Sequence, residues 1–215
     1  MTKDYTPNAI SDFVFGSEAS RQKIMSIIDG SLPFPSAGIT GILLYGTFGT
    51  GKSELAKLLP GAIESRYGDN DPAYRYEEIQ RGNDGAKVIQ NLQSQLQLVP
   101  FPAQYHYIVL DEVDNLNRET MPSLKLLMNA KNAVFILTTN NITKIERGVL
   151  DRCHQVEFNA ARPEQWLPLF QRIISDQNKI TPPDELALKI IERCDGSARR
   201  IISVAYACAK DCAPL

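Results

Sequence analysis

The sequence predicts an α/β fold in which a parallel sheet carries helices on both faces, followed by a small, entirely helical domain. Up to about residue 160, short apolar stretches alternate with amphipathic stretches of helical length. A glycine-rich loop follows the first apolar stretch, as in sheets that bind a ligand at the carboxyl ends of their strands. From Pro163 onward the strand pattern stops. We therefore expect a sheet domain over residues 1–160 and a helical domain over residues 161–215.

Helices are predicted where apolar residues recur at helical spacing, as Ile24, Ile27 and Ile28 do. The stretch 60–73 is polar and contains proline and glycine, which favours a long connection. Pro122 stands near the first turn of its helix, where a missing N–H costs least. The predicted strands are 41–45, 74–79, 105–110, 133–138 and 155–158, and the predicted helices are 17–29, 86–98, 122–128, 163–175, 184–194 and 197–212, besides one that follows the glycine-rich loop.

Composition narrows the class of protein. The 215 residues are 43% hydrophobic, which is enough for a sizeable core. No apolar run is long enough to span a membrane and the first residues lack a signal-peptide pattern, so we expect a cytoplasmic protein, associated with a nucleoid or nucleus, without a membrane partner. The four cysteines form no CxxC pair, which does not favour a zinc site. With a net charge of -2, any nucleic-acid binding must depend on a local basic patch.

The glycine-rich loop fits the phosphate-binding pattern GxxxxGK[ST]. Its glycines permit tight turns that aim backbone N–H groups at phosphates, Lys52 adds positive charge, and the Ser53 hydroxyl can bind magnesium. The helix that begins after the loop favours the same anion through its dipole. The nucleotide-binding residues expected here are Gly46, Thr47, Phe48, Gly49, Thr50, Gly51, Lys52, Ser53 and Glu54.

A pair of acids, Asp111 and Glu112, directly follows the strand 105–110. Acids at the carboxyl end of a buried parallel strand face the ligand crevice. There Asp111 can hold magnesium through water, and Glu112 can orient or deprotonate an attacking water. Glu112 therefore separates a hydrolase from a protein that only binds a nucleotide.

Asn140 ends the next strand, 133–138, in the run Thr138-Thr139-Asn140. At that position its side chain can hold the attacking water or the γ-phosphate. A turn that simply ends the strand explains the asparagine equally well.

In this order the motifs resemble those of the AAA+ ATPases, in particular the small subunits of clamp loaders such as replication factor C and its bacteriophage counterparts. Residues 5–16 are similar to the family segment YRPxxLxDhhG, although Thr6 replaces the family's arginine. The resemblance implies that the backbone around Val14 and Phe15 frames the adenine of ATP. Residues 123–128 are similar to the family's ALRRxME helix.

Two arginines gain roles from the same resemblance. Residues 150–153 match the SRC motif with Asp151 in place of serine, which makes Arg152 a finger offered to the γ-phosphate of a neighbouring subunit. Residues 196–200 resemble the GDxRR start of the last lid helix, which makes Arg199 the second sensor within the same subunit. An arginine at a helix N-terminus opposes the helix dipole, so an anionic partner or plain solvation must offset that cost.

The family's fold, cofactors and first sensor follow in the same way. The resemblance implies a P-loop AAA+ fold with ATP and Mg²⁺ as cofactors, residues 161–215 as the lid, and Asn140 as the first sensor. The expected catalytic residues are Glu112, Asn140, Arg152 and Arg199. Because a finger acts on the neighbouring site, efficient turnover requires an oligomer of AAA+ subunits.

DNA contact is expected at the N-terminal ends of two helices. Arg81 and Lys87 lie where the family has the stretch NASDxRG, and Arg118 precedes the helix at Pro122. Backbone amides and basic side chains there can bind phosphates. Ordinary solvated loops account for these three charges equally well.

The sequence therefore favours an ATP-hydrolysing module of clamp-loader type that remodels a DNA-replication complex, with a sliding clamp or a helicase as a further partner. The family's helical collar is expected to be absent, either through truncation or in a compact relative. Another DNA-linked AAA+ protein, such as a helicase loader, an initiator or a branch-migration motor, is the alternative. A scaffold that binds ATP to set its oligomeric state, with little turnover, is the third reading.

Overall fold

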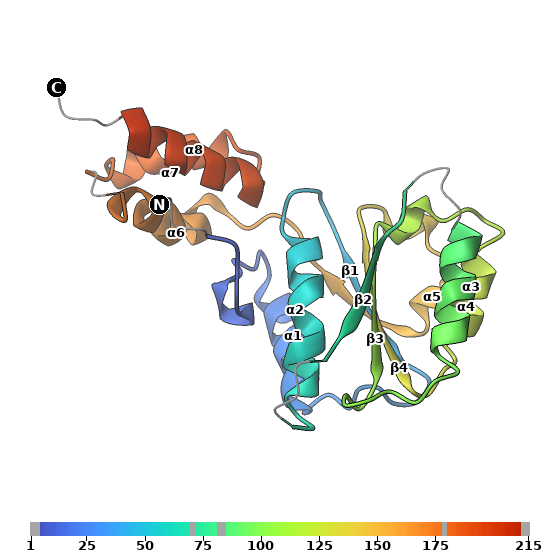
Figure 1. The fold of residues 1–215 in the computed structure, drawn as a ribbon. Helices are drawn as coiled ribbons and strands as arrows, with labels where there is room; N and C mark the ends of the chain where they lie inside the picture. The colour runs from blue at the N-terminus through green and yellow to red at the C-terminus, as the bar shows by residue number, and fades with distance from the viewer. Residues whose placement is uncertain (1–4, 69–71, 81–84, 178–179, 212–215) are drawn as a thin grey trace.

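The computed structural model describes residues 5–68, 72–80, 85–177 and 180–211 (Figure 1). Within these ranges one sheet runs in the order β2-β3-β4-β1-β5, and every neighbouring pair is parallel. The predicted parallel α/β fold is therefore confirmed. The strands are β1 (Gly41–Tyr45), β2 (Tyr74–Glu78), β3 (His106–Asp111), β4 (Ala133–Thr139) and β5 (Cys153–Glu157).

Helices cover both faces of the sheet (Figure 1). Successive strand residues point to opposite faces, so Ile42 and Leu44 join one buried cluster while Leu43 joins the other. All three side chains are fully buried, as expected for strands covered on both sides. One face carries α1 (Glu18–Asp29) and α2 (Lys52–Glu64), and the other carries α3 (Gly85–Gln95), α4 (Met121–Leu127) and α5 (Arg147–Leu150).

The C-terminal helices form a third packed body beside the sheet (Figure 1). They are α6 (Pro163–Ser175), α7 (Asp184–Glu192) and α8 (Ala198–Asp211), and they share a buried cluster that includes Phe170 and Ile201. Tyr5 belongs to this cluster, since its ring lies 5.8 Å from that of Tyr206 and its hydroxyl donates a 2.6 Å hydrogen bond to Asp176. The start of the described chain is thus held against the helical tail.

The predicted connection over residues 60–73 is wrong in its first part. Helix α2 continues through Pro60 to Glu64, because Leu59 and Ile63 are fully buried against the sheet. The Glu64 carboxylate, 1% exposed, accepts hydrogen bonds from the Tyr107 hydroxyl at 2.9 Å and a backbone amide at 2.7 Å. This packing outweighs the backbone hydrogen bond that a proline inside a helix removes.

Three short 3-10 turns complete the described fold: η1 (Ile10–Asp12), η2 (Val113–Asn115) and η3 (Ile142–Lys144). The turn η2 directly follows the acid pair at the end of β3, and it therefore lies at the edge of the sheet where a ligand is expected. No helix in the described ranges is long and apolar enough to cross a membrane.

Candidate active site

The phosphate-loop candidate connects β1 to α2 through three glycines with positive φ. Gly46 passes so close to the end of β5 that an added Cβ would lie 2.7 Å from the Phe158 carbonyl oxygen. Gly49 adopts φ +79°, and an added Cβ would lie 2.6 Å from Oγ of Ser197 in the helical tail. A side chain would meet backbone at Gly46 and the Ser197 side chain at Gly49, and both positions have positive φ, which explains why the loop favours glycine there.

Lys52 is the first residue of α2, directly after this loop, and is only 6% exposed. Its ammonium group donates hydrogen bonds to the carbonyl oxygens of Gly46 at 3.1 Å and Thr47 at 2.6 Å. Burial lowers the pKa of Lys52 to about 8, although the nearby carboxylates, Asp111 foremost, oppose that shift. The loop thus holds a weakly solvated cation that an anionic ligand would stabilise.

The loop and the end of β3 meet at Ser53 and Asp111. The Ser53 hydroxyl donates a 3.0 Å hydrogen bond to Oδ1 of Asp111, and Thr138 at the end of β4 donates to the same oxygen. On the other carboxylate oxygen, Tyr76 of β2 donates at 2.8 Å. Three segments of the fold, α2, β4 and β2, therefore fix one carboxylate that is 5% exposed.

This donor set fits magnesium. Mg²⁺ prefers oxygen ligands and usually takes one or two carboxylates together with waters and substrate phosphates. Ser53 and Asp111 supply a hydroxyl and a carboxylate beside the loop. No group of three or more His, Cys, Asp or Glu side chains is placed to hold a metal within the described ranges, so phosphate oxygens and water would have to complete the shell.

Glu112 adopts a left-handed backbone conformation with φ +57°, which is uncommon outside glycine and concentrated at functional sites. Its backbone N–H donates to Thr138 at 3.0 Å. The side-chain amide of Asn115 donates to its carboxylate at 3.0 Å and also to the carbonyl oxygen of Ile79 at 2.8 Å. The Glu112 carboxylate is thus oriented from η2 and from the end of β2.

A cavity of about 650 Å³ lies between the loop, the acid pair and the helical tail. This size is ordinary for a site that binds a small molecule. The tail approaches the loop directly, because the backbone N–H of Ala198 donates to the Gly49 carbonyl at 2.9 Å. The candidate residues that line the cavity are Val14, Phe48, Gly49, Thr50, Gly51, Lys52, Ser53, Glu54, Asp111, Glu112, Asn140 and Arg199.

Some nucleotide-binding candidates lie behind that lining. Gly46 and Thr47 contribute the carbonyl oxygens that hold Lys52. Within the loop, the residues that line the cavity begin at Phe48. Phe15 is 7% exposed, and its ring packs 5.3 Å from that of Phe158 inside the core. Its carbonyl oxygen accepts a 2.9 Å hydrogen bond from Gln165 of α6, so the backbone at this position links the sheet to the helical tail.

Arg152 lies at the opposite end of the strands from the phosphate-loop candidate. Its carbonyl oxygen accepts from the N–H of Gly41 at the start of β1, whereas the phosphate-loop candidate follows the end of that strand. Its guanidinium donates to Asn129 Oδ1 at 2.9 Å and to the Gly148 carbonyl at 2.8 Å. The residue is not part of the wall of this cavity.

Sequence reasoning missed several residues of the site, both in the cavity wall and behind it. Thr138 lines the cavity, whereas Tyr76 and Asn115 are not part of its lining and instead hold Asp111 and Glu112. The pairing of the parallel strands supplies a usable signal for Tyr76. Tyr76 pairs with Val109, so its side chain lies on the same face of the sheet as that of Asp111. The other unexpected lining residues are Tyr5, Thr6, Pro7, Asn8, Asp12, Phe13, Trp166, Leu169, Arg172, Ala198, Ile202 and Tyr206.

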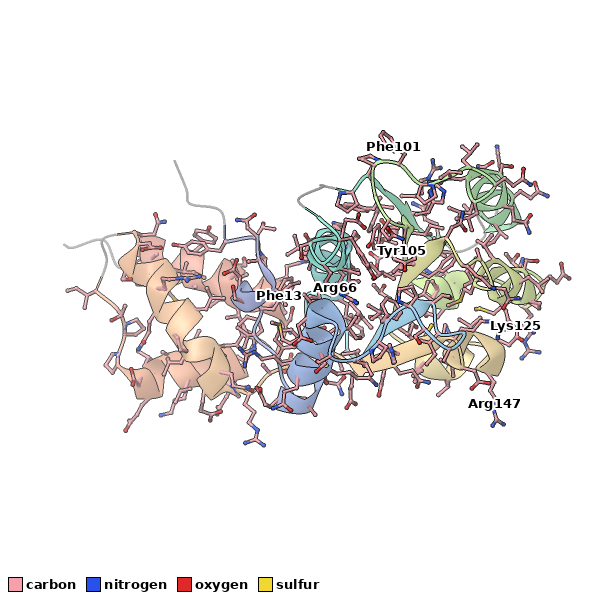
Figure 2. The ribbon with its side chains drawn as sticks, turned by 90° about the horizontal axis from the view of Figure 1, so that it is seen from below. Phe13, Arg66, Phe101, Tyr105, Lys125 and Arg147 are labelled. Carbon is pink, nitrogen blue, oxygen red and sulfur yellow. The ribbon has the colours of Figure 1, made fainter. Side chains whose placement is uncertain are left out.

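Figure 2 places Phe13 on the side of the sheet that faces the helical tail and places Lys125 and Arg147 on the far side.

The residues expected to contact DNA lie away from the cavity lining. Lys87 and Arg118 are exposed, near the start of α3 and before α4, while Arg81 lies outside the described residues.

Comparison with known proteins gives a consistent picture. Residues 42–160, more than half of the chain, match the family model described as "ATPase family associated with various cellular activities (AAA)". Replication factor C subunit 3 of Schizosaccharomyces pombe is 25% identical over 213 residues, which cover 95% of this chain and 58% of that protein. DNA polymerase III subunit gamma of Buchnera aphidicola is 24% identical over 222 residues, which again cover 95% of this chain and 58% of that protein. The chain thus spans less than two thirds of these relatives.

Replication factor C subunit 3 of Arabidopsis thaliana is 30% identical over 100 residues, 46% of this chain and 28% of that protein. Among solved structures, the Holliday junction branch migration motor RuvB of Thermotoga maritima superposes with a TM-score of 0.67 at 16% identity. That match covers 94% of this chain and 64% of RuvB, and at this identity it concerns the fold.

Proposed function

This chain belongs to the AAA family of ATPases, and we propose that it hydrolyses ATP as a clamp-loader-type subunit of an oligomer that remodels a DNA-replication complex. One observation carries the proposal. The glycine-rich loop, the acid pair and Arg199 from the helical tail all line a single cavity of about 650 Å³. This arrangement supports ATP hydrolysis, which requires groups that bind phosphate, activate water and stabilise charge within one site.

The residues of the site divide the work. The loop amides and Lys52 hold the phosphates, and the Val14 side of the cavity receives the base. Glu112, oriented by Asn115 and Thr138, accepts a proton from the attacking water, which Asn140 helps to position. Magnesium, when bound at Ser53 and Asp111, would neutralise charge that develops on the phosphate oxygens.

Arg152 completes the site of the neighbouring subunit. Arg152 is held by Asn129 and Gly148 at the end of the strands opposite the cavity, which supports a role between subunits rather than within one. An arginine finger spreads positive charge over the transition state and contributes about 10³–10⁵ in rate. Turnover is therefore expected to depend on assembly.

The helical tail converts hydrolysis into movement. Ala198 donates to Gly49 within the loop, and Arg199 lines the same cavity one residue later. A change in the phosphates is thereby transmitted to α8, and through it to the tail as a unit. Residues 161–215 accordingly act as a lid on the domain formed by residues 1–160.

The proposed partners rest on the relatives. Replication factor C subunits and a DNA polymerase III gamma subunit are among the similar proteins, which favours other AAA+ subunits, DNA and a sliding clamp. Exposed Lys87 and Arg118 supply positive charge for the DNA backbone. Both side chains are near helix starts, where backbone amides also bind phosphate.

The test is the stimulation of ATP hydrolysis by partners. Steady-state turnover of the full chain would be measured alone, with a primed DNA template, and with that template plus the sliding clamp of the same organism. We expect the largest increase with template and clamp together. An increase with the replicative helicase, and none with the clamp, would instead assign the chain to helicase loading. ATP binding without hydrolysis under every condition would indicate a scaffold.

A further inference from the structure

The strand β2 contributes a hydroxyl to the acid centre of the site. Tyr76 donates a 2.8 Å hydrogen bond to Oδ2 of Asp111, the carboxylate oxygen that neither Ser53 nor Thr138 contacts. Register explains the reach, since Tyr76 pairs with Val109 and therefore lies on the same face of the sheet as Asp111, two residues further along β3.

The ring of Tyr76 is itself held in place. Lys57 of α2 lies over it, with its ammonium 5.1 Å from the ring centre, and forms a 2.9 Å ion pair with Glu54. A cation over an aromatic face stabilises that arrangement. The seated ring keeps the Tyr76 hydroxyl within hydrogen-bond distance of Asp111.

Three donors leave Asp111 with a fixed orientation. Ser53 and Thr138 both donate to Oδ1, whereas Tyr76 is the side chain within the described ranges that donates to Oδ2. Without the Tyr76 hydroxyl, the plane of the carboxylate would be set from one side only. Groups that orient a metal-binding carboxylate commonly change metal affinity by about 10- to 100-fold.

We propose that Tyr76 is a positioning residue for the magnesium that accompanies the nucleotide, acting by fixing the carboxylate of Asp111. This inference rests on the proposed function, because it assumes that a Mg²⁺–nucleotide complex is the ligand of the cavity. It adds β2 to the binding apparatus and gives Lys57 and Glu54 a role in seating the tyrosine ring.

The test compares nucleotide affinity with and without the metal. A non-hydrolysable ATP analogue would be titrated calorimetrically into wild type and into Tyr76→Phe, first with excess Mg²⁺ and then with EDTA. Tyr76→Phe removes one oxygen and keeps the ring under Lys57. The matched control is Tyr74→Phe. Tyr74 lies on the same face of β2 as Tyr76 and is 40% exposed. Thermal unfolding would establish that both variants fold.

We expect Tyr76→Phe to bind the analogue about 10-fold more weakly with Mg²⁺ and within 2-fold of wild type in EDTA, because only the metal-dependent part of binding involves Asp111. Tyr74→Phe should match wild type in both conditions. Equal losses with and without metal would overturn the inference, since they indicate a structural role. Unchanged affinity in both conditions would overturn it while leaving the proposed function intact. A wild type whose affinity does not depend on Mg²⁺ would overturn both.

Should Tyr76→Phe fail to fold, Lys57→Gln would replace it, because that change loosens the ring without altering the strand. A smaller loss confined to the Mg²⁺ condition would support the inference, and no such loss would contradict it.

Discussion

The hydroxyl of Ser53 donates a 3.0 Å hydrogen bond to Oδ1 of Asp111, joining two residues that are 58 positions apart in the chain. The phosphate-loop candidate and the acid pair thus form one site. Because parallel strands β1 and β3 end at the same edge of the sheet, with β4 between them, the fold itself imposes this meeting.

Removal of the loop cation should abolish tight nucleotide binding. Lys52→Ala is expected to weaken the affinity for ATP by about 10- to 100-fold, since a hydrogen bond to a charged group contributes about 1.5–3 kcal/mol. Calorimetric titration with a non-hydrolysable analogue measures this. Lys125→Ala is the control, because Lys125 pairs with Glu146 on the far side of the sheet (Figure 2). Equal affinity of the two variants would contradict the assignment of Lys52.

Nucleotide affinity should fall in alkaline solution. Burial lowers the pKa of Lys52 to about 8, so the free protein loses this cation as the pH rises through about 8. Affinity is therefore expected to fall as the pH rises from 8 to 10, while Lys52→Ala shows a flatter profile. The same lowered pKa makes Lys52 contribute increasing stability between pH 8 and its ordinary pKa of 10.5, because the unfolded chain then binds more protons. An affinity that is independent of pH over this range in wild type would argue against a buried cation at the phosphates.

The close approach of loop and tail predicts opposite effects of two glycine substitutions. Gly49→Ala forces a Cβ to within 2.6 Å of Ser197 and into a left-handed conformation, at a cost of about 1–3 kcal/mol. Gly61→Ala meets nothing within 4 Å inside α2 and should stabilise by about 0.5–1 kcal/mol. Denaturant unfolding measures both changes, and ATP affinity should fall only for Gly49→Ala. A neutral Gly49→Ala would show that the tail does not press on the loop.

Much of this arrangement could be predicted from the sequence. The helix 163–175 and the strand that begins at Ala133 are predicted at their observed starts. Pro163 marks the start of the helix, and the apolar run from Ala133 indicates a buried strand. Helix α2 was predicted too short because Pro60 is a strong local signal, whereas the burial of Leu59, Ile63 and Glu64 is visible only in three dimensions. Tertiary packing decided against the local preference.

The site was less predictable where it depends on contacts between distant elements. Lys52 and Asp111 belong to motifs, but Tyr76 and Asn115 act through single hydrogen bonds that no local pattern announces. Tyr5 and Arg172 line the cavity for a similar reason, since Tyr5 packs on the helical tail. Register between strands, once known, accounts for Tyr76.

The role proposed for Arg152 can be tested by mixing subunits. Arg152→Ala should keep ATP affinity within a few-fold and lose most turnover, by about 10³ or more. Arg147→Ala, an exposed arginine nearby on α5, is the control and should turn over normally.

Mixing Arg152→Ala with Glu112→Gln should restore activity, although neither variant is active alone. In a mixed oligomer, roughly a quarter of the interfaces would join an intact Glu112 to an intact Arg152 of its neighbour. Rates that stay at the level of the separate variants would remove the role between subunits, provided that gel filtration shows the mixed oligomer.

The most direct test of ATP hydrolysis in this cavity is a single-turnover measurement on wild type and Glu112→Gln, in the presence of Mg²⁺ and with enzyme in excess over radiolabelled ATP. The account predicts that both proteins bind ATP with affinities within a few-fold of each other, while hydrolysis by Glu112→Gln is slower by about 10²–10⁴, the contribution of a positioned general base. Equal rates of hydrolysis in the two proteins would contradict it.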